Sequence, residues 1–222
     1  MPRLPSAARN PGLLLLGHRG ARSVREIPEN TFASFDRALD DGCHGFEFDV
    51  RLTADLEAVI CHDPKVHGLE IAKSGSGDLS MLPRLRDVLA RYRDVFLDIE
   101  LKVPGLEKAA IDEVREHRVE RFVISSFLPE VLHAAHELDP AVALGLICET
   151  SDELRGWKQI PVAYLMPHRK LVRKRLVSEL HDAGKKLLAW TVNEAEEMTR
   201  FAEWGVDGVI SDNTKLLTAT LG

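Results

Sequence analysis

Apolar residues recur along this chain with two periods that alternate from one end to the other. Short apolar runs predict strands, and apolar residues spaced three or four positions apart predict one face of a helix. Eight strands are predicted. One begins at residue 45, and the others are residues 13–16, 95–102, 121–127, 142–148, 162–167, 186–192 and 208–212. The predicted helices are residues 31–41, 84–93, 106–117, 129–138, 153–157, 171–183 and 194–204.

Residues that commonly begin or end helices flank several of these segments. Asn30 precedes the first predicted helix and is a candidate N-cap, while Gly42, Gly184 and Gly205 follow three of the helices and are candidate stops. A further apolar run at residues 58–61 is interpreted as the return arm of a hairpin, and the Gly- and Ser-rich segment that follows predicts a loop.

Eight strands, most of them followed by a helix, predict an α/β protein with a closed (β/α)8 TIM barrel. We expect a single domain over residues 1–222, with the barrel at about residues 13–216. An open doubly wound sheet is the alternative, but no G-x-G-x-x-G motif follows a strand anywhere in the sequence.

The strand that begins at residue 45 carries acids between its apolar residues. Phe46 and Phe48 share one face of the strand, and Glu47 and Asp49 share the other. Because apolar residues must cover the helix side of a barrel, we expect the two acids to point into the lumen, about 7 Å apart along the strand. On this strand alone, a metal site and a salt-bridged polar layer are equally good interpretations.

The same alternation recurs in the strand 95–102, where Asp98, Glu100 and Lys102 lie between apolar residues. Active sites of TIM barrels lie at the carboxyl ends of the strands, where both sets of acids are expected. Buried like charges repel each other, so a divalent cation is the natural counter-charge. Carboxylate ligands without thiolates or a histidine cluster indicate a hard ion, Mg²⁺ or Ca²⁺.

Two of the nine histidines follow apolar strands near these acids. His18 and His62 in this position indicate a pair that donates and accepts protons. Arg19 and Lys102 add fixed positive charge, which suits a bound phosphate group. Together these residues predict metal-assisted phosphoryl chemistry with histidine acid–base catalysis.

At this point the sequence resembles a known family. The motifs that carry the resemblance are GHRG at 17–20, PENT at 28–31, EFDVRLTAD at 47–55, HD at 62–63, DIELK at 98–102, VISSF at 123–127, WTVN at 190–193 and GVDGVISDN at 205–213. They are similar, in order and over nearly the whole chain, to those of the glycerophosphodiester phosphodiesterase family. The resemblance implies a TIM barrel that hydrolyses glycerophosphodiesters to sn-glycerol 3-phosphate and an alcohol.

The resemblance also implies roles for individual residues. The metal ligands would be Glu47, Asp49 and Glu100, the catalytic histidines His18 and His62, and the phosphate-binding residues Arg19 and Lys102. Glu29 would lie near the metal or the glycerol, and Trp190 would form a wall of the pocket, although core packing explains Trp190 equally well.

The sequence departs from the family pattern after the HD motif. Members commonly carry an insertion there, whereas only residues 64–83 fill the interval here. The catalytic set is complete, but an open pocket would also suit a larger lipid phosphodiester, in a lysophospholipase D-like reaction. We rank that alternative lower because few basic clusters or exposed apolar stretches favour membrane docking. A catalytically inactive phosphate-binding barrel is the third interpretation, and the complete catalytic set counts against it.

Composition narrows the partners and the location. A formal net charge of −6 gives no support to a nucleic-acid partner, and we expect a small-molecule substrate. Three cysteines without a CxxC motif indicate a reducing compartment, so we expect a cytoplasmic protein. The apolar run 13–16 is too short to span a bilayer, which argues against stable membrane insertion. The sequence does not predict an oligomeric state.

Overall fold

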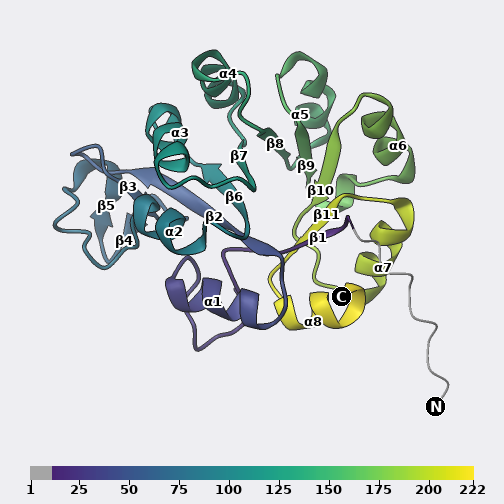
Figure 1. Cartoon of the computed structure of the whole chain (residues 1–222), viewed down its shortest axis with the longest axis horizontal. Helices are drawn as coiled ribbons and strands as arrows, with labels where there is room; N and C mark the ends of the chain where they lie inside the picture. The colour runs from purple at the N-terminus through teal and green to yellow at the C-terminus, as the bar shows by residue number, and fades with distance from the viewer. Residues whose placement is uncertain (1–11) are drawn as a thin grey trace.

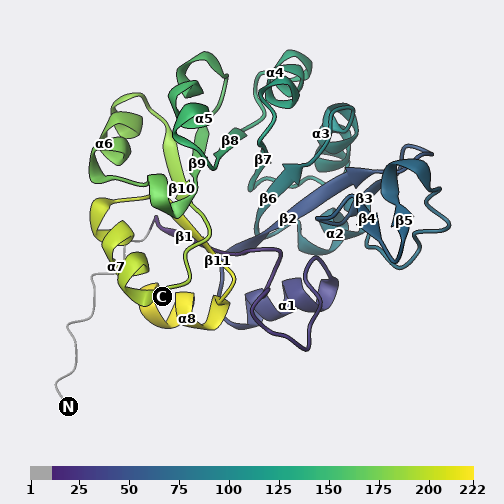
Figure 2. The ribbon, with the colours of Figure 1, turned by 180° about the vertical axis from the view of Figure 1, so that it is seen from behind.

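The predicted apolar runs become the strands of a barrel in the computed structural model, which describes residues 12–222. The strands are β1 (Leu14–Gly17), β2 (Gly45–Leu52), β6 (Phe96–Leu101), β7 (Phe122–Ser126), β8 (Leu144–Cys148), β9 (Tyr164–Pro167), β10 (Lys186–Ala189) and β11 (Gly208–Ser211). They are parallel and follow one another around the barrel in chain order (Figure 1, Figure 2). The ring closes at β1, which pairs with β11 on one side and with β2 on the other, where Leu16 lies opposite Gly45. The predicted TIM barrel is therefore confirmed, and the open sheet is wrong.

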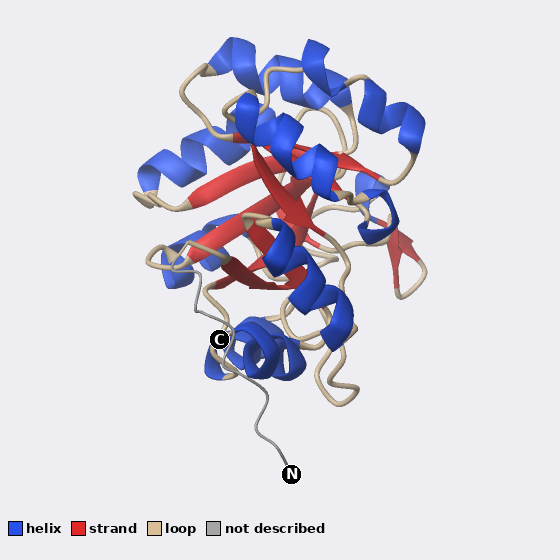
Figure 3. Cartoon of the chain, turned by 90° about the vertical axis from the view of Figure 1, so that its right-hand side faces the viewer, coloured by secondary structure: helices blue, strands red, loops and turns tan. Residues whose placement is uncertain are grey.

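Helices surround the strands on the outside of the barrel (Figure 3). They are α1 (Phe32–Asp40), α2 (Leu85–Tyr92), α3 (Glu107–Glu116), α4 (Pro129–Leu138), α5 (Ser151–Arg155), α6 (Lys174–Asp182), α7 (Ala195–Trp204) and α8 (Thr214–Leu221). The last helix was not predicted. The predicted single domain starts at residue 1, and its first 11 residues lie outside the described part of the chain, so its full extent stays a prediction.

The N-cap prediction for the first helix is wrong by one residue. Thr31 caps α1, because its hydroxyl accepts a hydrogen bond from the backbone N–H of Ser34. Asn30 instead has a left-handed backbone with φ 57°, a conformation that asparagine tolerates better than most residues. This turn frees the Asn30 side chain to point toward β2, where it contributes to the site described below.

The predicted hairpin arm is present, but it lies outside the barrel ring. Strand β3 (Ala58–Ile60) pairs antiparallel with the end of β2. Residues 69–73 of the predicted loop 67–80 are ordered into strand β5 (Leu69–Glu70), which pairs with β4 (Lys65–Val66) just before the loop, and a 3₁₀ turn (Ile71–Lys73). Figure 1 shows β4 and β5 at the edge of the molecule, beside β3.

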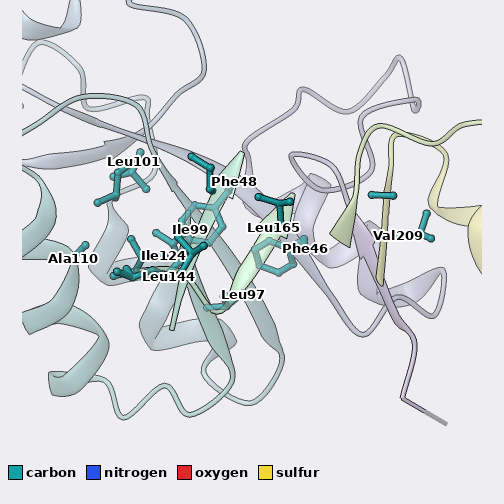
Figure 4. Packing of buried hydrophobic residues seen from close by; sticks show 14 of the residues in the cluster. Phe46, Phe48, Leu97, Ile99, Leu101, Ala110, Ile124, Leu144, Leu165 and Val209 are labelled. Atoms are coloured by element: carbon teal, nitrogen blue, oxygen red, sulfur yellow. The ribbon is translucent and has the colours of Figure 1, made fainter. Parts of the chain in front are cut away.

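The main apolar core lies between the barrel and the helices (Figure 4). Phe46 and Phe48 are fully buried there, as the alternation of β2 predicted. Phe35 of α1 stacks on Phe46 with ring centroids 4.2 Å apart and meets Phe48 at 5.8 Å. These contacts fix the orientation of β2, so its other face is turned into the lumen.

Phe35→Ala should lower the free energy of unfolding by about 3–5 kcal/mol, because it leaves a cavity against two buried rings. Leu138→Ala is the control, since Leu138 is 50% exposed and should change stability by less than about 1 kcal/mol. Urea unfolding followed by circular dichroism measures both. Equal effects of the two substitutions would show that α1 does not anchor β2.

Candidate active site

Two neighbouring strands place four carboxylates at one end of the barrel lumen. Parallel pairing sets Glu47 of β2 beside Asp98 of β6, and Asp49 beside Glu100. All four are buried, with exposed fractions of 7% or less. One oxygen from each of Glu47, Asp49 and Glu100 lies within 4.8 Å of the other two. The register of two strands thus brings together acids that are far apart in the sequence.

This crowding shifts the protonation of the acids. Burial, together with the neighbouring carboxylates, raises the pKa of Glu47 well above its usual value. The same causes raise the pKa of Glu100 to about 7. Burial would also raise the pKa of Asp49, but two nearby cations outweigh burial and hold that pKa below its usual value. The nearby cations therefore do not fully compensate the negative charge of Glu47 and Glu100, and a further positive charge would stabilise the ionised cluster.

The two cations are the predicted phosphate-binding residues. Lys102, which follows β6, places Nζ 2.6 Å from Oε1 of Glu100 and 3.3 Å from Oδ1 of Asp49. Arg19, which follows β1, places Nε 3.2 Å from Oδ2 of Asp49 and donates from Nη1 to Glu29 at 2.7 Å. Both cations thus lie against the acid cluster.

The acid cluster fits a divalent metal ion. Oε1 of Glu47 and Oδ1 of Asp49 are buried without a hydrogen bond, although buried polar atoms normally have a partner. With Glu100 they form an all-oxygen donor set of the kind that Mg²⁺ and Ca²⁺ prefer. Asp98 is not part of this three-residue donor set, and its Oδ1 accepts a hydrogen bond from the hydroxyl of Ser125 at 2.5 Å.

His18 is held rigidly at the end of β1. Its Nδ1 lies 2.6 Å from Oδ1 of Asp212, and its Nε2 lies 3.8 Å from Oε2 of Glu47. Asp212 in turn accepts a hydrogen bond from Asn193 at 2.7 Å. Burial opposes ionisation of Asp212, but its hydrogen bonds and the charge of His18 outweigh burial and lower its pKa to about 2. A carboxylate at this position fixes the orientation of the imidazole ring.

His62 is held more loosely. Its side chain is 34% exposed, and its Nδ1 lies 2.8 Å from Oδ1 of Asp63, whose side chain is 74% exposed. Only its backbone is clamped, because Arg51 donates two hydrogen bonds to the carbonyl oxygen of His62 at 2.6 and 2.8 Å. The two histidines therefore face the same cavity from very different environments.

The cavity has a volume of about 300 Å³ and two unlike sides. Its polar side contains most of the predicted site residues, namely His18, Arg19, Glu47, His62, Glu100 and Lys102. Its apolar side contains Phe127, Ile147, Met166, Trp190 and Ile210. The indole N–H of Trp190 donates to the carbonyl oxygen of Met166 at 2.7 Å, and its ring stands perpendicular to that of Phe127. Trp190 therefore lines the cavity, and its indole N–H is hydrogen-bonded to the backbone.

Two of the predicted residues lie elsewhere. Asp49 lies behind the cavity wall with no exposed surface. Glu29 lines a neighbouring polar pocket together with Arg22 and Asp212, and its carboxylate pairs with Arg22 at 2.6 Å as well as with Arg19. In this structure Glu29 therefore organises two arginines rather than the acid cluster.

Sequence reasoning missed two residues that hold the site together. Asp212 orients His18, and Asn30 donates from Nδ2 to Oδ2 of Asp49 at 2.8 Å. Asn30 lies in the PENT motif and Asp212 in the GVDGVISDN motif, so the available signal was a polar residue within a motif that carried the resemblance. Nothing in the local pattern indicated which distant side chain each would contact.

Comparison with known proteins agrees with this geometry. The model of the glycerophosphoryl diester phosphodiesterase family matches residues 18–87 and 76–216. This chain belongs to that family. It is therefore a phosphoric diester hydrolase, and the predicted family and enzyme class are confirmed.

Relatives resemble the whole chain rather than a part of it. A glycerophosphodiester phosphodiesterase from Caldanaerobacter subterraneus is 30% identical over 236 aligned positions, covering 92% of this chain and 96% of the relative. The structure of a phosphodiesterase from Oleispira antarctica, in complex with the product sn-glycerol-3-phosphate, is 27% identical with a TM-score of 0.83, covering 94% of this chain and 96% of that chain. A glycerophosphodiester phosphodiesterase from Parabacteroides distasonis is 25% identical with a TM-score of 0.83, covering 95% of this chain and 97% of that chain.

Residues 12–222 include no helix with the length and apolar character that crossing a bilayer requires.

Adding Mg²⁺ or Ca²⁺ should raise the melting temperature of the chain, since an ion bound only by the folded state stabilises it by about 2.7 kcal/mol at 100 times its Kd. Glu100→Gln should remove most of that shift, because it removes the charge of one of the three carboxylates in the cluster. Glu113→Gln, an acid on α3 paired with His117, is the control and should keep the shift. Calorimetric melting with and without chelator measures it, and an unchanged shift in Glu100→Gln would contradict the assigned site.

Proposed function

We propose that this enzyme hydrolyses glycerophosphodiesters to sn-glycerol 3-phosphate and an alcohol, with Glu47, Asp49 and Glu100 holding Mg²⁺ or Ca²⁺. The observation that carries the proposal is the meeting of two histidines, two cations and a three-carboxylate cluster around one cavity. The relative from Oleispira antarctica, which binds sn-glycerol-3-phosphate, supports the same product for this chain.

Arg19 and Lys102 are proposed to bind the phosphate group of the substrate. Arg19 lies 3.2 Å from Oδ2 of Asp49 and Lys102 lies 3.3 Å from Oδ1, and both cations line the cavity, which supports a phosphate site shared by the two. A divalent ion in the cluster would supply electrophilic polarisation of the phosphoryl oxygens. The guanidinium of Arg19 offers paired donors, while the ammonium of Lys102 acts as a point charge on a flexible side chain.

His18 and His62 are proposed as the general base and general acid, with their order left open. One imidazole takes the proton from the attacking oxygen as that oxygen bonds to phosphorus. The other imidazole gives a proton to the alkoxide that leaves as its bond to phosphorus breaks. If water attacks, sn-glycerol 3-phosphate forms directly. If the neighbouring glycerol hydroxyl attacks, a cyclic phosphate forms first, and product analysis distinguishes the two routes.

The location and the partners are also proposals. Cys43, Cys61 and Cys148 are all free thiols, which supports a reducing compartment and hence the cytoplasm. The substrate is proposed to be a small molecule, because the cavity volume of about 300 Å³ suits a ligand of that size. The negative net charge argues against nucleic acid as a substrate.

His18→Ala and His62→Ala should each lower kcat on glycerophosphocholine by about 100-fold or more, because each removes a proton-transfer group. Metal binding, measured by calorimetry, should remain near that of the parent.

The parent should release sn-glycerol 3-phosphate from glycerophosphocholine, and lysophosphatidylcholine should be the poorer substrate. Near-full activity of either variant would overturn the acid–base assignment, and preference for lysophosphatidylcholine would favour the lipid-directed reaction.

Asp212→Asn should lower kcat by about 10–100-fold, because an amide no longer fixes the His18 ring as the carboxylate does. Asp63→Asn is the matched control, and its effect should be smaller because Asp63 is largely exposed beside the looser His62. Initial rates across pH and melting temperatures measure both variants. A positioning role predicts an altered pH profile at an unchanged melting temperature, whereas equal effects of the two substitutions would contradict it.

A further inference from the structure

A run of basic residues lies beside the cavity and takes no part in the proposed chemistry. Five of the seven residues from 169 to 175, RKLVRKR, are Lys or Arg, and none is acidic, although the whole chain has a net charge of −6. The run begins with a 3₁₀ turn (Arg169–Leu171) after β9 and continues into the first turn of α6. We call residues 169–175 the basic strip. The sequence-based expectation that few basic clusters favour membrane docking overlooked this run.

The basic strip lies on the same face of the barrel as the active-site cavity. It follows the carboxyl end of β9, and the carboxyl ends of parallel strands share one face. The backbone N–H of Arg169 donates to the carbonyl oxygen of Trp190 at 2.6 Å, so the strip starts one hydrogen bond away from the cavity wall. Figure 1 shows α6 and α7 next to each other on the outside of the barrel.

Most of the charge of the strip is free. Glu197 of α7 pairs with Arg169 at 2.7 Å and also with Arg200, which neutralises the first residue of the strip. The other four cations are exposed and form no ion pair within residues 12–222, namely Lys170, Arg173, Lys174 and Arg175. Arg173 is fixed in place, because its Nη1 donates to two backbone carbonyls of the strip at 2.7 and 2.8 Å.

Helix stability does not explain these cations. The first turn of α6 contains Lys174 and Arg175 but no acid, although the positive end of the helix dipole favours acids there. The strip also lacks an apolar anchor, since Val172 is buried and Leu171 is half-buried. Its exposed surface is therefore almost purely cationic, which predicts binding that is electrostatic, reversible and sensitive to salt.

We propose that the basic strip docks this enzyme on anionic lipid surfaces, with the cavity mouth turned toward the membrane. Four free cations fall in the range that recognises anionic phospholipids. The remainder of this acidic chain is repelled by such a surface, so the strip also sets the orientation of the docked enzyme. The benefit, access to phosphodiesters at or near a lipid surface, rests on the proposed function, whereas the binding itself does not.

The test is sedimentation of the full chain with two kinds of vesicle, phosphatidylcholine alone and phosphatidylcholine with about one third phosphatidylglycerol. We expect binding only to the anionic vesicles. The protein should be released at about 1 M salt, because the Debye length falls to about 3 Å there and charges farther apart are screened. The triple variant Lys170→Glu, Lys174→Glu and Arg175→Glu should weaken binding by at least about 100-fold, since the loss of each cation costs about fivefold and each new carboxylate adds repulsion.

The matched control changes the same charge on the opposite face of the barrel. Arg93, Arg121 and Lys186 are exposed and lie at the amino ends of β6, β7 and β10, and their replacement by Glu should leave vesicle binding near that of the parent. Both triple variants should turn over soluble glycerophosphocholine like the parent, which separates docking from catalysis. Equal binding to neutral vesicles, equal loss in both variants, or binding of single-stranded DNA without binding of vesicles would each overturn the proposal.

Discussion

The repulsion among carboxylates in the barrel lumen is the constraint on which the rest of the site depends. Glu47, Asp49 and Glu100 occupy neighbouring strands, where the sheet register leaves them no freedom to separate. Their burial is tolerable only with compensating charge, and Arg19 and Lys102 supply part of it from the ends of their own strands. Among the described residues, Oε1 of Glu47 has no hydrogen-bond partner and Oδ1 of Asp49 has only its ion pair with Lys102, so these oxygens mark where we propose that a cation binds.

Delivering Arg19 to the acid cluster requires an unusual backbone after β1. Arg19 and Asn30 both have left-handed φ values, 51° and 57°, which non-glycine residues adopt at a cost in free energy. The turn is stabilised by the contacts it creates, because the backbone N–H of Arg19 donates to Glu47 and the side chain of Asn30 donates to Asp49. The strained backbone of Arg19 and Asn30 is therefore offset by the hydrogen bonds that hold Glu47 and Asp49 in place.

The sequence was sufficient to predict what depends on local periodicity. Alternation along β2 and β6 predicted which faces carry acids, and the number of strand–helix units predicted the barrel. Contacts that depend on closure of the ring could not be read this way: Asp212 and His18 are 194 positions apart and meet only because β11 pairs with β1. The N-cap of α1 was misplaced because Asn30 and Thr31 are both good caps. The hydrogen bond from the Asn30 side chain to Asp49 is a tertiary contact, and it leaves Thr31 to cap the helix.

The short segment 64–83 has a clearer role in the structure than in the sequence. Its apolar residues Ile71 and Leu79 pack on Val59 of β3, outside the barrel, and among the described residues none of the cavity lining comes from this segment. The cavity is bounded instead by side chains from the later strands, such as Phe127 and Trp190. Because no residue of this segment lines the cavity, its short length removes no cavity wall that the structure shows, and we infer that the choice of alcohol depends on the apolar side of the cavity.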